Sequence, residues 1–190
     1  MRGVTSQPRR RMTLSSTETR EARFTRVYEQ HHETVRRYVW RRDPDIVDDV
    51  LAETFLVAWR RLDEIPEQAA PWLIGVARNV RRNERRGARR RQAVSTRLAD
   101  AVPALAGVDA PREAAAVEAS LRTLAARDRE VLLLAVWDGL DRAAIAAALG
   151  CSKANASLRL HRARRRLATA LRTIDADSNR GLAFADSRRS

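Results

Sequence analysis

The segment from Asp141 to Leu171 reads DRAAIAAALGCSKANASLRLHRARRRLATAL, and it decides the fold of this chain. Its first part is rich in alanine and apolar, which favours a helix, and Gly150 can end that helix in the left-handed conformation at no Cβ cost. Ser152 can accept a hydrogen bond from a free N–H of the next turn, so a second helix should begin about three residues later. Two helices joined in this way are typical of a DNA-reading helix-turn-helix.

The second helix of this segment combines an apolar stripe with a basic face. The stripe is formed at helical spacing by Ala156, Leu160, Ala163, Leu167 and Leu171. Seven basic residues and no acidic residue lie between Lys153 and Arg172, which favours a helix that lies against phosphate. A solvated cationic face on a helical bundle is the alternative, and the preceding helix and turn argue against it. The predicted DNA-binding residues are Ser152, Lys153, Asn155, Leu158, Arg159, His161, Arg162, Arg165 and Arg166.

The charge of the whole chain is concentrated in two places. Its 190 residues have a formal net charge of +13 and include only 7 Gly and 6 Pro, so an all-helical chain of one medium or two small domains is expected. Residues 78–91 hold eight arginines and Glu84, for +7, and residues 153–172 hold another +7, which leaves 13 − 14 = −1 for the rest. Two separate cationic patches predict two contacts with one polyanion.

Several classes of protein are disfavoured by the sequence. The longest apolar runs, 131–137 and 143–149, have seven residues each and cannot span a bilayer. The N-terminal arginines are not followed by an apolar segment, so we expect a cytoplasmic protein with no secretory signal and no direct membrane insertion. The single cysteine, Cys151, excludes an internal disulfide. His31 and His32 have no further ligand cluster, and no phosphate loop or nucleophile–base pair is present, so we predict no metal, no cofactor, no small-molecule substrate and no enzymatic activity.

The N-terminal half begins with two predicted helices. Residues 1–18 are polar and basic, so we expect a disordered arm, and one helical face follows that contains Phe24, Val27, Tyr28, His31, Val35, Tyr38 and Val39. Asp43 as N-cap and Pro44 at the first helical position predict a second helix that ends near residue 62. Its inward positions are Val47, Val50, Leu51, Thr54, Ala58 and Leu62.

The second helix carries acidic residues in its first half, where the helix dipole favours them. They are Asp45, Asp48, Asp49 and Glu53. A metal site for hydrolysis is disfavoured because no His, Ser or Lys partner lies near them in the sequence. A solvated acidic face and a docking surface for a basic partner are the two interpretations that remain.

A third helix, opened by Pro71, combines an aromatic residue with arginines. Its inward residues are Trp72, Leu73, Val76, Ala77 and Val80, and its outward residues are Arg78, Arg81, Arg82, Arg85 and Arg86. Aromatic and cationic groups together suit strands with unstacked bases, because any base can stack on a ring while arginines hold the backbone. Trp72 as an ordinary core residue is the alternative.

Residues 93–111 are punctuated by Pro103, Gly107 and Pro111 and predict a linker, which could reach about 65 Å when extended. The expected fold is therefore all-α, with two small helical domains joined by a flexible linker and a helix-turn-helix in the C-terminal one. The expected boundaries are a domain over 19–92, a linker over 93–112, a domain over 113–173 and a disordered tail over 174–190.

Three motifs, in this order, carry a family resemblance over residues 22–172. They are DDVLAETFLVAWR at 48–60, PWLIGVARN at 71–79, and RDREVLLL at 127–134 together with LHRAR at 160–164. With them the chain resembles a sigma factor of the sigma-70 family, in its extracytoplasmic-function (ECF) group. The resemblance implies a promoter-specificity subunit that binds core RNA polymerase, directs it to minus-10 and minus-35 promoter elements and assists opening. A free-standing helix-turn-helix regulator is the alternative.

The resemblance also implies partners and residue roles. The partners are core RNA polymerase, promoter DNA and an anti-sigma factor. Polymerase binding falls on Asp48, Asp49, Glu53, Phe55 and Trp59. Minus-10 binding falls on Trp72, Arg78, Asn79, Arg81, Arg82 and Arg85, with the loop over residues 63–70 as the pocket for a flipped base.

The chain departs from the family pattern at three places. Ala52 lies where the docking segment usually has Gln, and Ala144 replaces the usual Glu of the first helix of the helix-turn-helix. Residues 155–158 read Asn-Ala-Ser-Leu instead of the common Thr-Val-Lys-Ser at the start of the reading helix. The promoter preference of relatives therefore cannot be transferred to this chain.

Overall fold

A computed structural model describes residues 19–92 and 112–186, which form helices and connecting turns and contain no strand. The all-α prediction is confirmed for these residues. The predicted arm over 1–18 and nearly all of the predicted linker, 93–111, lie outside them. The elements are α1 (Arg20–Trp40), the 3₁₀ turn η1 (Pro44–Ile46), α2 (Val47–Arg60), the 3₁₀ turn η2 (Leu62–Glu64), α3 (Ala69–Gln92), α4 (Arg112–Thr123), α5 (Ala126–Val136), α6 (Arg142–Leu149) and α7 (Lys153–Asp186).

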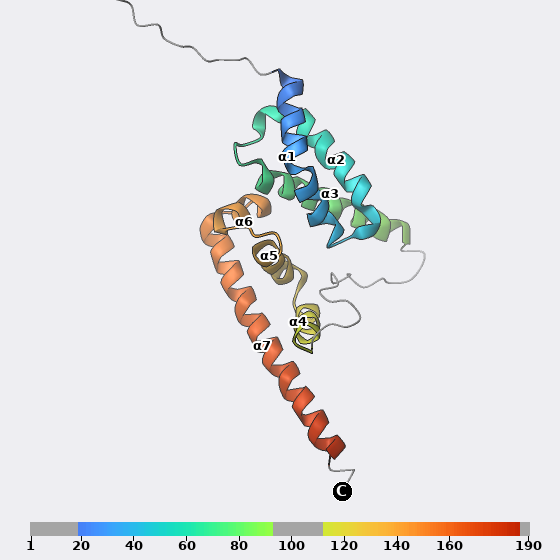
Figure 1. Ribbon diagram of the computed structural model, residues 1–190, viewed down its shortest axis with the longest axis vertical. Helices are drawn as coiled ribbons and strands as arrows, with labels where there is room; N and C mark the ends of the chain where they lie inside the picture. The colour runs from blue at the N-terminus through green and yellow to red at the C-terminus, as the bar shows by residue number, and fades with distance from the viewer. Residues whose placement is uncertain (1–18, 93–111, 187–190) are drawn as a thin grey trace, which may run out of the picture.

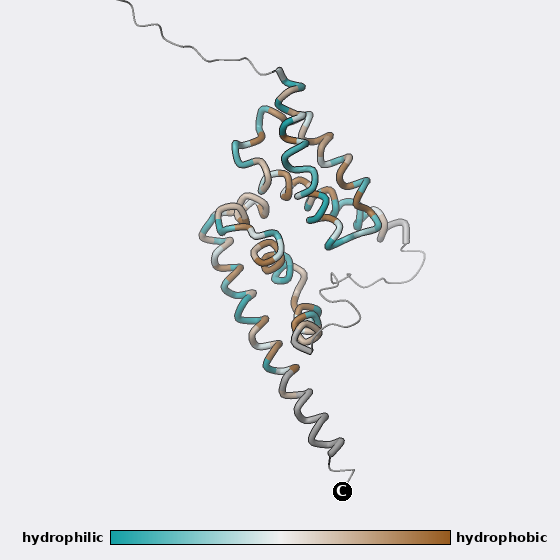
Figure 2. The backbone as a smooth tube through the Cα atoms, in the orientation of Figure 1, coloured by the Kyte–Doolittle hydropathy of each residue, from teal (hydrophilic) through white to brown (hydrophobic). Residues whose placement is uncertain are grey.

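The helices form two units that lie against each other (Figure 1). Helices α1, α2 and α3 pack on one another as the N-terminal unit, and α4, α5 and α6 pack with α7 as the C-terminal unit. Hydrophobic and hydrophilic stretches alternate along the helices (Figure 2), as amphipathic helices require. Within the described residues, no helix is both long and apolar enough to span a membrane.

Helix α1 is built as the sequence predicts. Thr19 caps it, because the Ala22 N–H donates to the Thr19 hydroxyl over 3.1 Å. Val35, Tyr38 and Val39 are fully buried against the neighbouring helices. Tyr28, on the same predicted face, remains 40% exposed at the edge of the unit.

The start of α2 differs from the prediction. Residues 44–46 form a 3₁₀ turn, α2 begins at Val47, and the Asp43 side chain makes no capping hydrogen bond. Its carboxylate accepts hydrogen bonds from Arg81 Nη1 and Arg85 Nε instead, each over 2.7 Å. Hydrogen bonds between ionised groups are roughly twice as strong as neutral ones, which explains why Asp43 joins the arginines of α3 rather than capping α2.

The helix-turn-helix forms where the sequence places it. Gly150 ends α6 in the left-handed conformation (φ 62°, ψ 44°), and its N–H donates to the carbonyls of Ala146 and Ala147. The Asn155 N–H donates to the Ser152 hydroxyl over 3.2 Å at the start of α7. The predictions for Gly150 and Ser152 are confirmed. The stripe of Ala156, Leu160 and Ala163 is at most 5% exposed.

Helix α7 is longer than predicted. It continues to Asp186, whereas the sequence predicted a disordered tail from residue 174. Leu171 and Ile174 are half-buried, and Ile174 extends the apolar stripe beyond the predicted helix-turn-helix. A helix that is already nucleated adds one hydrogen bond per residue, so the polar residues of this segment and Gly181 do not end it.

One apolar cluster crosses the boundary between the two units. It includes Leu73 and Ile74 of α3 together with Ile145 and Ala148 of α6. The backbones approach closely at Gly75, where an added Cβ would lie 3.2 Å from the Ala148 carbonyl oxygen. A glycine at this position lets α3 and α6 touch.

Candidate nucleic-acid and polymerase surfaces

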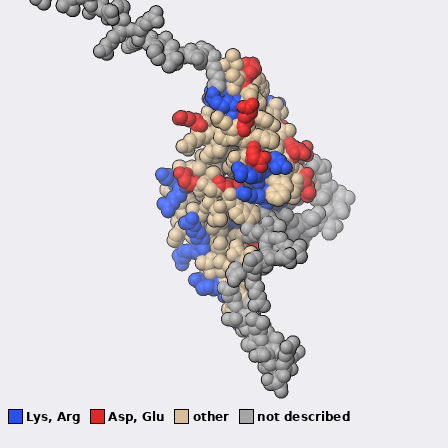
Figure 3. Space-filling model, viewed as in Figure 1, with Lys and Arg blue, Asp and Glu red and all other residues tan. Residues whose placement is uncertain are grey.

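The basic face of α7 is open to solvent. Every residue of this face that the sequence analysis assigned to DNA is exposed. The apolar side chain among them, Leu158, is 47% exposed. Figure 3 shows Lys and Arg side chains along the edge of the molecule where Figure 1 places α7. The helix thus presents a continuous cationic face with one apolar side chain, which suits contact with phosphates and with a base edge or a thymine methyl.

Arg166 also has a structural contact. Its Nη1 donates to a carboxylate oxygen of Asp128, which lies in the first turn of α5 and is 9% exposed. This ion pair joins α7 to α5 and orients the basic helix on the rest of its unit. Arg166 therefore stabilises the packing of α7 on α5 and also adds to the positive charge of the α7 face.

The residues of α2 that are predicted to bind polymerase fall into two groups, one exposed and one packed against α1. The carboxylates of Asp48, Asp49 and Glu53 are exposed. Phe55 is only 5% exposed, with its ring 4.7 Å from that of Tyr28. Trp59 is half-buried, and its ring meets Phe24 edge-on at 5.2 Å, with the Arg20 guanidinium also 5.2 Å from its centroid. The carboxylates thus form an exposed acidic surface on α2, while Phe55 and Trp59 pack α2 against α1.

The arginines of α3 are not all directed to solvent, as the sequence analysis expected. Arg82 and Asn79 are exposed and Arg78 is half-buried, but Arg81 is only 9% exposed, so its predicted outward orientation is wrong. The C-terminal unit covers this face of α3, and a buried guanidinium needs carboxylate partners to offset its desolvation. Arg81 has two, Asp43 at 2.7 Å and Glu130 at 3.3 Å. The positive charge of Arg78, with some burial, lowers the pKa of Arg82.

Glu130 of α5 is the centre of a polar cluster between the units. The Tyr38 hydroxyl donates to its Oε1 over 2.9 Å, and the nearest nitrogens of Arg42 and Arg78 lie 3.8 Å and 3.9 Å from the same oxygen. We call the set Tyr38, Arg41, Arg42, Asp43, Arg78, Arg81, Glu130 and Asp138 the interface cluster. Burial, followed by the negative charge of Glu130, raises the pKa of Tyr38 well above its usual range.

A second acidic residue of the C-terminal unit, Asp138, completes this cluster. Its carboxylate accepts from Arg42 Nη2 over 2.7 Å, and Arg41 Nη1 donates to the Trp137 carbonyl over 2.8 Å. Burial raises the pKa of Asp138, and the charge of Arg42 opposes that rise. Sequence reasoning missed Arg42, Glu130 and Asp138 because their partners lie between 49 and 96 positions away in the chain.

The interface cluster has more donors than acceptors. Among the described residues, the buried Nε atoms of Arg42, Arg78 and Arg81 have no hydrogen-bond partner. Each such group costs about 1–3 kcal/mol when it is left unsatisfied. The Glu130 carboxylate therefore lies next to one hydroxyl and three guanidinium groups, and it cannot accept hydrogen bonds from all of their donors.

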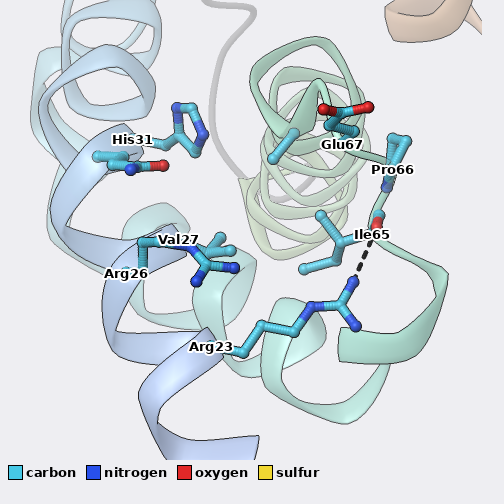
Figure 4. A pocket seen from close by; sticks show the side chains of 9 residues that line it. Arg23, Arg26, Val27, His31, Ile65, Pro66 and Glu67 are labelled. Carbon is cyan, nitrogen blue, oxygen red and sulfur yellow. Dashed lines mark hydrogen bonds between the residues drawn. The ribbon is translucent and has the colours of Figure 1, made fainter. Parts of the chain in front are cut away.

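A pocket of about 190 Å³ lies between α1 and the segment that precedes α3 (Figure 4). Its lining consists of Arg23, Arg26, Val27, Gln30, His31, Ile65, Pro66, Glu67 and Ala69. Arg23 donates to the Ile65 carbonyl over 3.1 Å and fixes one wall. Partial burial lowers the pKa of His31. Trp72 is not among the lining residues; it is half-buried, with the Arg61 guanidinium 5.6 Å from its ring centroid.

Two parts of the chain match known family models, and together they define a DNA-binding transcription initiation factor. Residues 27–91 match Sigma-70 region 2, and residues 114–167 match Sigma-70, region 4. The chain belongs to the sigma-70 family of RNA polymerase sigma factors, in the ECF group, and is a promoter-specificity subunit. This confirms the resemblance that the three sequence motifs indicated.

Similar proteins support this placement. The chain is 32% identical over 156 residues to the ECF RNA polymerase sigma factor SigL of Mycobacterium tuberculosis, with 78% of this chain and 88% of SigL covered. It is 30% identical over 159 residues to the ECF RNA polymerase sigma factor BldN of Streptomyces coelicolor, with 78% and 60% covered.

Two solved structures share the fold. One is the sigma factor RpoE of Bartonella quintana in complex with the anti-sigma factor NepR, with a TM-score of 0.60, 22% identity, and 78% of this chain and 96% of that chain covered. The other is CnrH in complex with the cytosolic domain of CnrY, with a TM-score of 0.55, 26% identity, and 84% and 91% covered.

Proposed function

We propose that this sigma factor uses three separate surfaces during initiation and catalyses no covalent step itself. The acidic surface of α2 binds core RNA polymerase, the basic face of α7 reads the minus-35 duplex, and α3 with the nearby pocket binds the minus-10 strand. The observation that carries the proposal is that exposed carboxylates on α2 and an exposed cationic recognition helix lie on different units of one chain. The test is run-off transcription by core polymerase with and without the protein, since a chain that neither binds core polymerase nor directs initiation would refute the proposal.

The minus-35 contact rests on the geometry of the helix-turn-helix. In this motif the second helix enters the major groove with its N-terminal residues toward the base edges. The Arg162→Ala substitution should weaken duplex binding by about 1–3 kcal/mol and relax discrimination at one base pair if Arg162 reads a guanine. Arg164→Ala, which removes the same charge from the same helix outside the predicted reading face, is the matched control. Equal weakening on all sequences would make Arg162 a phosphate contact instead.

The polymerase contact rests on the acidic surface of α2. Asp49→Lys with Glu53→Lys reverses two exposed charges and should abolish binding to core polymerase, because like charges oppose each other across an interface. Glu29→Lys with Glu33→Lys on α1 makes the same change of charge at other exposed positions and should retain binding. Retained binding by the α2 variant, measured by co-purification with core polymerase, would contradict the assignment of this surface.

The minus-10 contact rests on the pocket beside α1. Its volume of about 190 Å³ is below the roughly 300–1,000 Å³ of sites that enclose drug-sized ligands, so a single unstacked base is a fitting occupant. Abasic substitution at each position of the non-template strand should locate one position where the holoenzyme loses about 1–3 kcal/mol of binding.

A plugging substitution tests the same pocket from the protein side. Gln30 is exposed and lines the pocket, so Gln30→Trp should fill it and remove the penalty for that abasic position. Glu29→Trp adds the same ring at a neighbouring exposed position outside the lining and should leave the penalty unchanged. A uniform profile along the strand for the unmodified protein would exclude the pocket as a base site.

We further propose that the chain has an anti-sigma partner and works in the cytoplasm, where polymerase and promoter DNA are found. RpoE was co-crystallised with the anti-sigma factor NepR, and the structure of CnrH was solved in complex with the cytosolic domain of CnrY. Affinity capture with the full chain, followed by mass spectrometry, should recover one small protein that blocks run-off transcription. Recovery of polymerase subunits alone would argue against this partner.

A further inference from the structure

Trp40, the last residue of α1, has different surroundings from the other tryptophans of the chain. Trp59, Trp72 and Trp137 are half-buried, each with an arginine guanidinium 5.2 Å, 5.6 Å and 5.8 Å from its ring centroid, respectively. Trp40 is 58% exposed and makes no ring or cation–π contact within the described part of the chain. Tryptophan is highly buried on average, so an open indole at the end of a helix is a surface that a partner can cover.

Two exposed arginines accompany this open ring. Arg36 and Arg37 precede Trp40 by four and three residues, so they are its neighbours on the surface of the helix. Arg36 Nη1 lies 3.8 Å from a Glu33 carboxylate oxygen with its side chain still 49% exposed, and such exposed pairs contribute little. Residues 34–42 contain four arginines and no acidic residue. We call Arg36, Arg37 and Trp40 the α1 platform.

The α1 platform matches the chemistry of an unpaired nucleic-acid strand. Any base can stack on an exposed aromatic ring while arginines hold the phosphates on either side. In a duplex the bases already stack on one another, so a duplex offers phosphates to the arginines but no free base face to Trp40. The combination of an open indole with positive charge therefore favours a separated strand over a duplex.

The α1 platform also lies on the same side of α1 as part of the pocket. Arg26 lines the pocket (Figure 4), and Arg37 and Trp40 follow it by 11 and 14 residues. At about 100° per residue, these three positions fall within an arc of about 60°. A rise of about 1.5 Å per residue places Trp40 about 21 Å from Arg26 along the helix axis. A strand with about 3.4 Å per nucleotide covers that distance in about six nucleotides, so one strand can reach both places.

We propose that the α1 platform is a second site for unpaired DNA, in which one base stacks on Trp40 while Arg36 and Arg37 hold the neighbouring phosphates. Its place on the promoter rests on the proposed assignment of the pocket to the minus-10 strand, whereas the stacking itself requires no polymerase. The site stabilises the opened promoter and not the duplex, because only separated strands present a free base face.

The experiment separates stacking from charge by comparing two short fluorescent strands of equal length. One is an oligothymidine, and the other has the same phosphates with an abasic residue at every position. Binding of each strand to the full chain is measured by anisotropy. Stacking of one base contributes about 5- to 150-fold in affinity. Trp40→Ala should therefore lower the preference for the oligothymidine by about this factor, and Trp40→Phe, which keeps a ring, should lower it less.

Two further variants serve as controls. Val136→Ala shortens another exposed apolar side chain, which is 71% exposed on α5, and should leave the preference unchanged. Arg36→Gln with Arg37→Gln should weaken the binding of both strands by the same factor, because both strands carry the phosphates. Equal preference in Trp40→Ala and the unmodified chain would overturn the proposal. An unmodified chain that binds no oligothymidine would do the same, since the α1 platform is exposed in the free chain.

A second measurement applies if Trp40→Ala loses its helical circular dichroism. Stacking quenches indole emission, so the quenching that oligothymidine causes in the unmodified chain should be reduced in Trp40→Phe, and unchanged quenching would overturn the proposal. Loss of core polymerase binding by Trp40→Ala with its strand preference intact would assign Trp40 to a protein contact instead. Run-off transcription by the unmodified chain tests the proposed function separately, because the strand assay contains no polymerase.

Discussion

The hydrogen bond between Tyr38 and Glu130 gives a direct test of the contact between the units. Tyr38 is fully buried, and its hydroxyl donates to Glu130 over 2.9 Å. Tyr38→Phe removes that hydroxyl and keeps the ring that stacks under the Arg42 guanidinium at 4.0 Å. A hydrogen bond to a charged group contributes about 1.5–3 kcal/mol. Because Arg81 still donates to Glu130 in the variant, we expect a loss near the lower limit, about 1.5 kcal/mol.

The assay is a double-mutant cycle measured by urea unfolding and followed by circular dichroism. The four proteins are the unmodified chain, Tyr38→Phe, Glu130→Gln and the double variant. If the two side chains touch in solution, the coupling energy should be about 1–2 kcal/mol, within the range for residues in direct contact. Tyr28→Phe is the matched control, since Tyr28 lies on the same helix and is 40% exposed; its effect should stay within about 0.5 kcal/mol.

Additivity would refute this reasoning. If the effects of Tyr38→Phe and Glu130→Gln add within about 0.3–0.5 kcal/mol, the two groups do not interact. In that case the contact between Tyr38 and Glu130 does not help to hold the two units together in the free chain.

Three further predictions concern the turn, the core and the pocket. Gly150→Ala should lower stability by about 1–2 kcal/mol because an L-residue is strained in the left-handed conformation, and an unchanged urea midpoint would contradict the observed φ. Ile145→Ala, at a fully buried position, should cost about 2–5 kcal/mol, and a loss below about 1 kcal/mol would show that Ile145 is not in the core. The lowered pKa of His31 means that the folded chain favours the neutral imidazole. The stability that this group contributes is therefore fully present above its unfolded pKa of about 6.5. It is lost as the pH falls through the lower pKa of the folded state. Its NMR titration midpoint should lie below that of the same histidine in urea, and a higher midpoint would be the contrary result.

Local signals in the sequence predicted local structure well. Gly150 and Ser152 have their expected roles because their interactions reach only the adjacent turn. The inward positions of α2 are confirmed, with Val50 and Ala58 fully buried. The periodicity of apolar residues contains the information needed for these predictions.

Interactions between distant residues could not be predicted in the same way. Asp43 has the sequence context of an N-cap, yet its carboxylate binds Arg81 and Arg85, about 40 positions further along the chain. Arg81 shares the spacing of the exposed arginines of α3, but the C-terminal unit covers it. Which arginine is buried depends on how the two units meet, and the contacts between them include the close approach at Gly75 and the ion pair at Glu130.

The apolar cluster shared by the two units also makes their separation depend on temperature. Opening would bring Ile74 and Ile145 into contact with water, since both belong to the cluster that crosses the boundary. Exposure of apolar surface raises the heat capacity, so the free energy of such a transition is curved and has a maximum at moderate temperature. The fraction of molecules with separated units should therefore rise on both cooling and heating from that optimum.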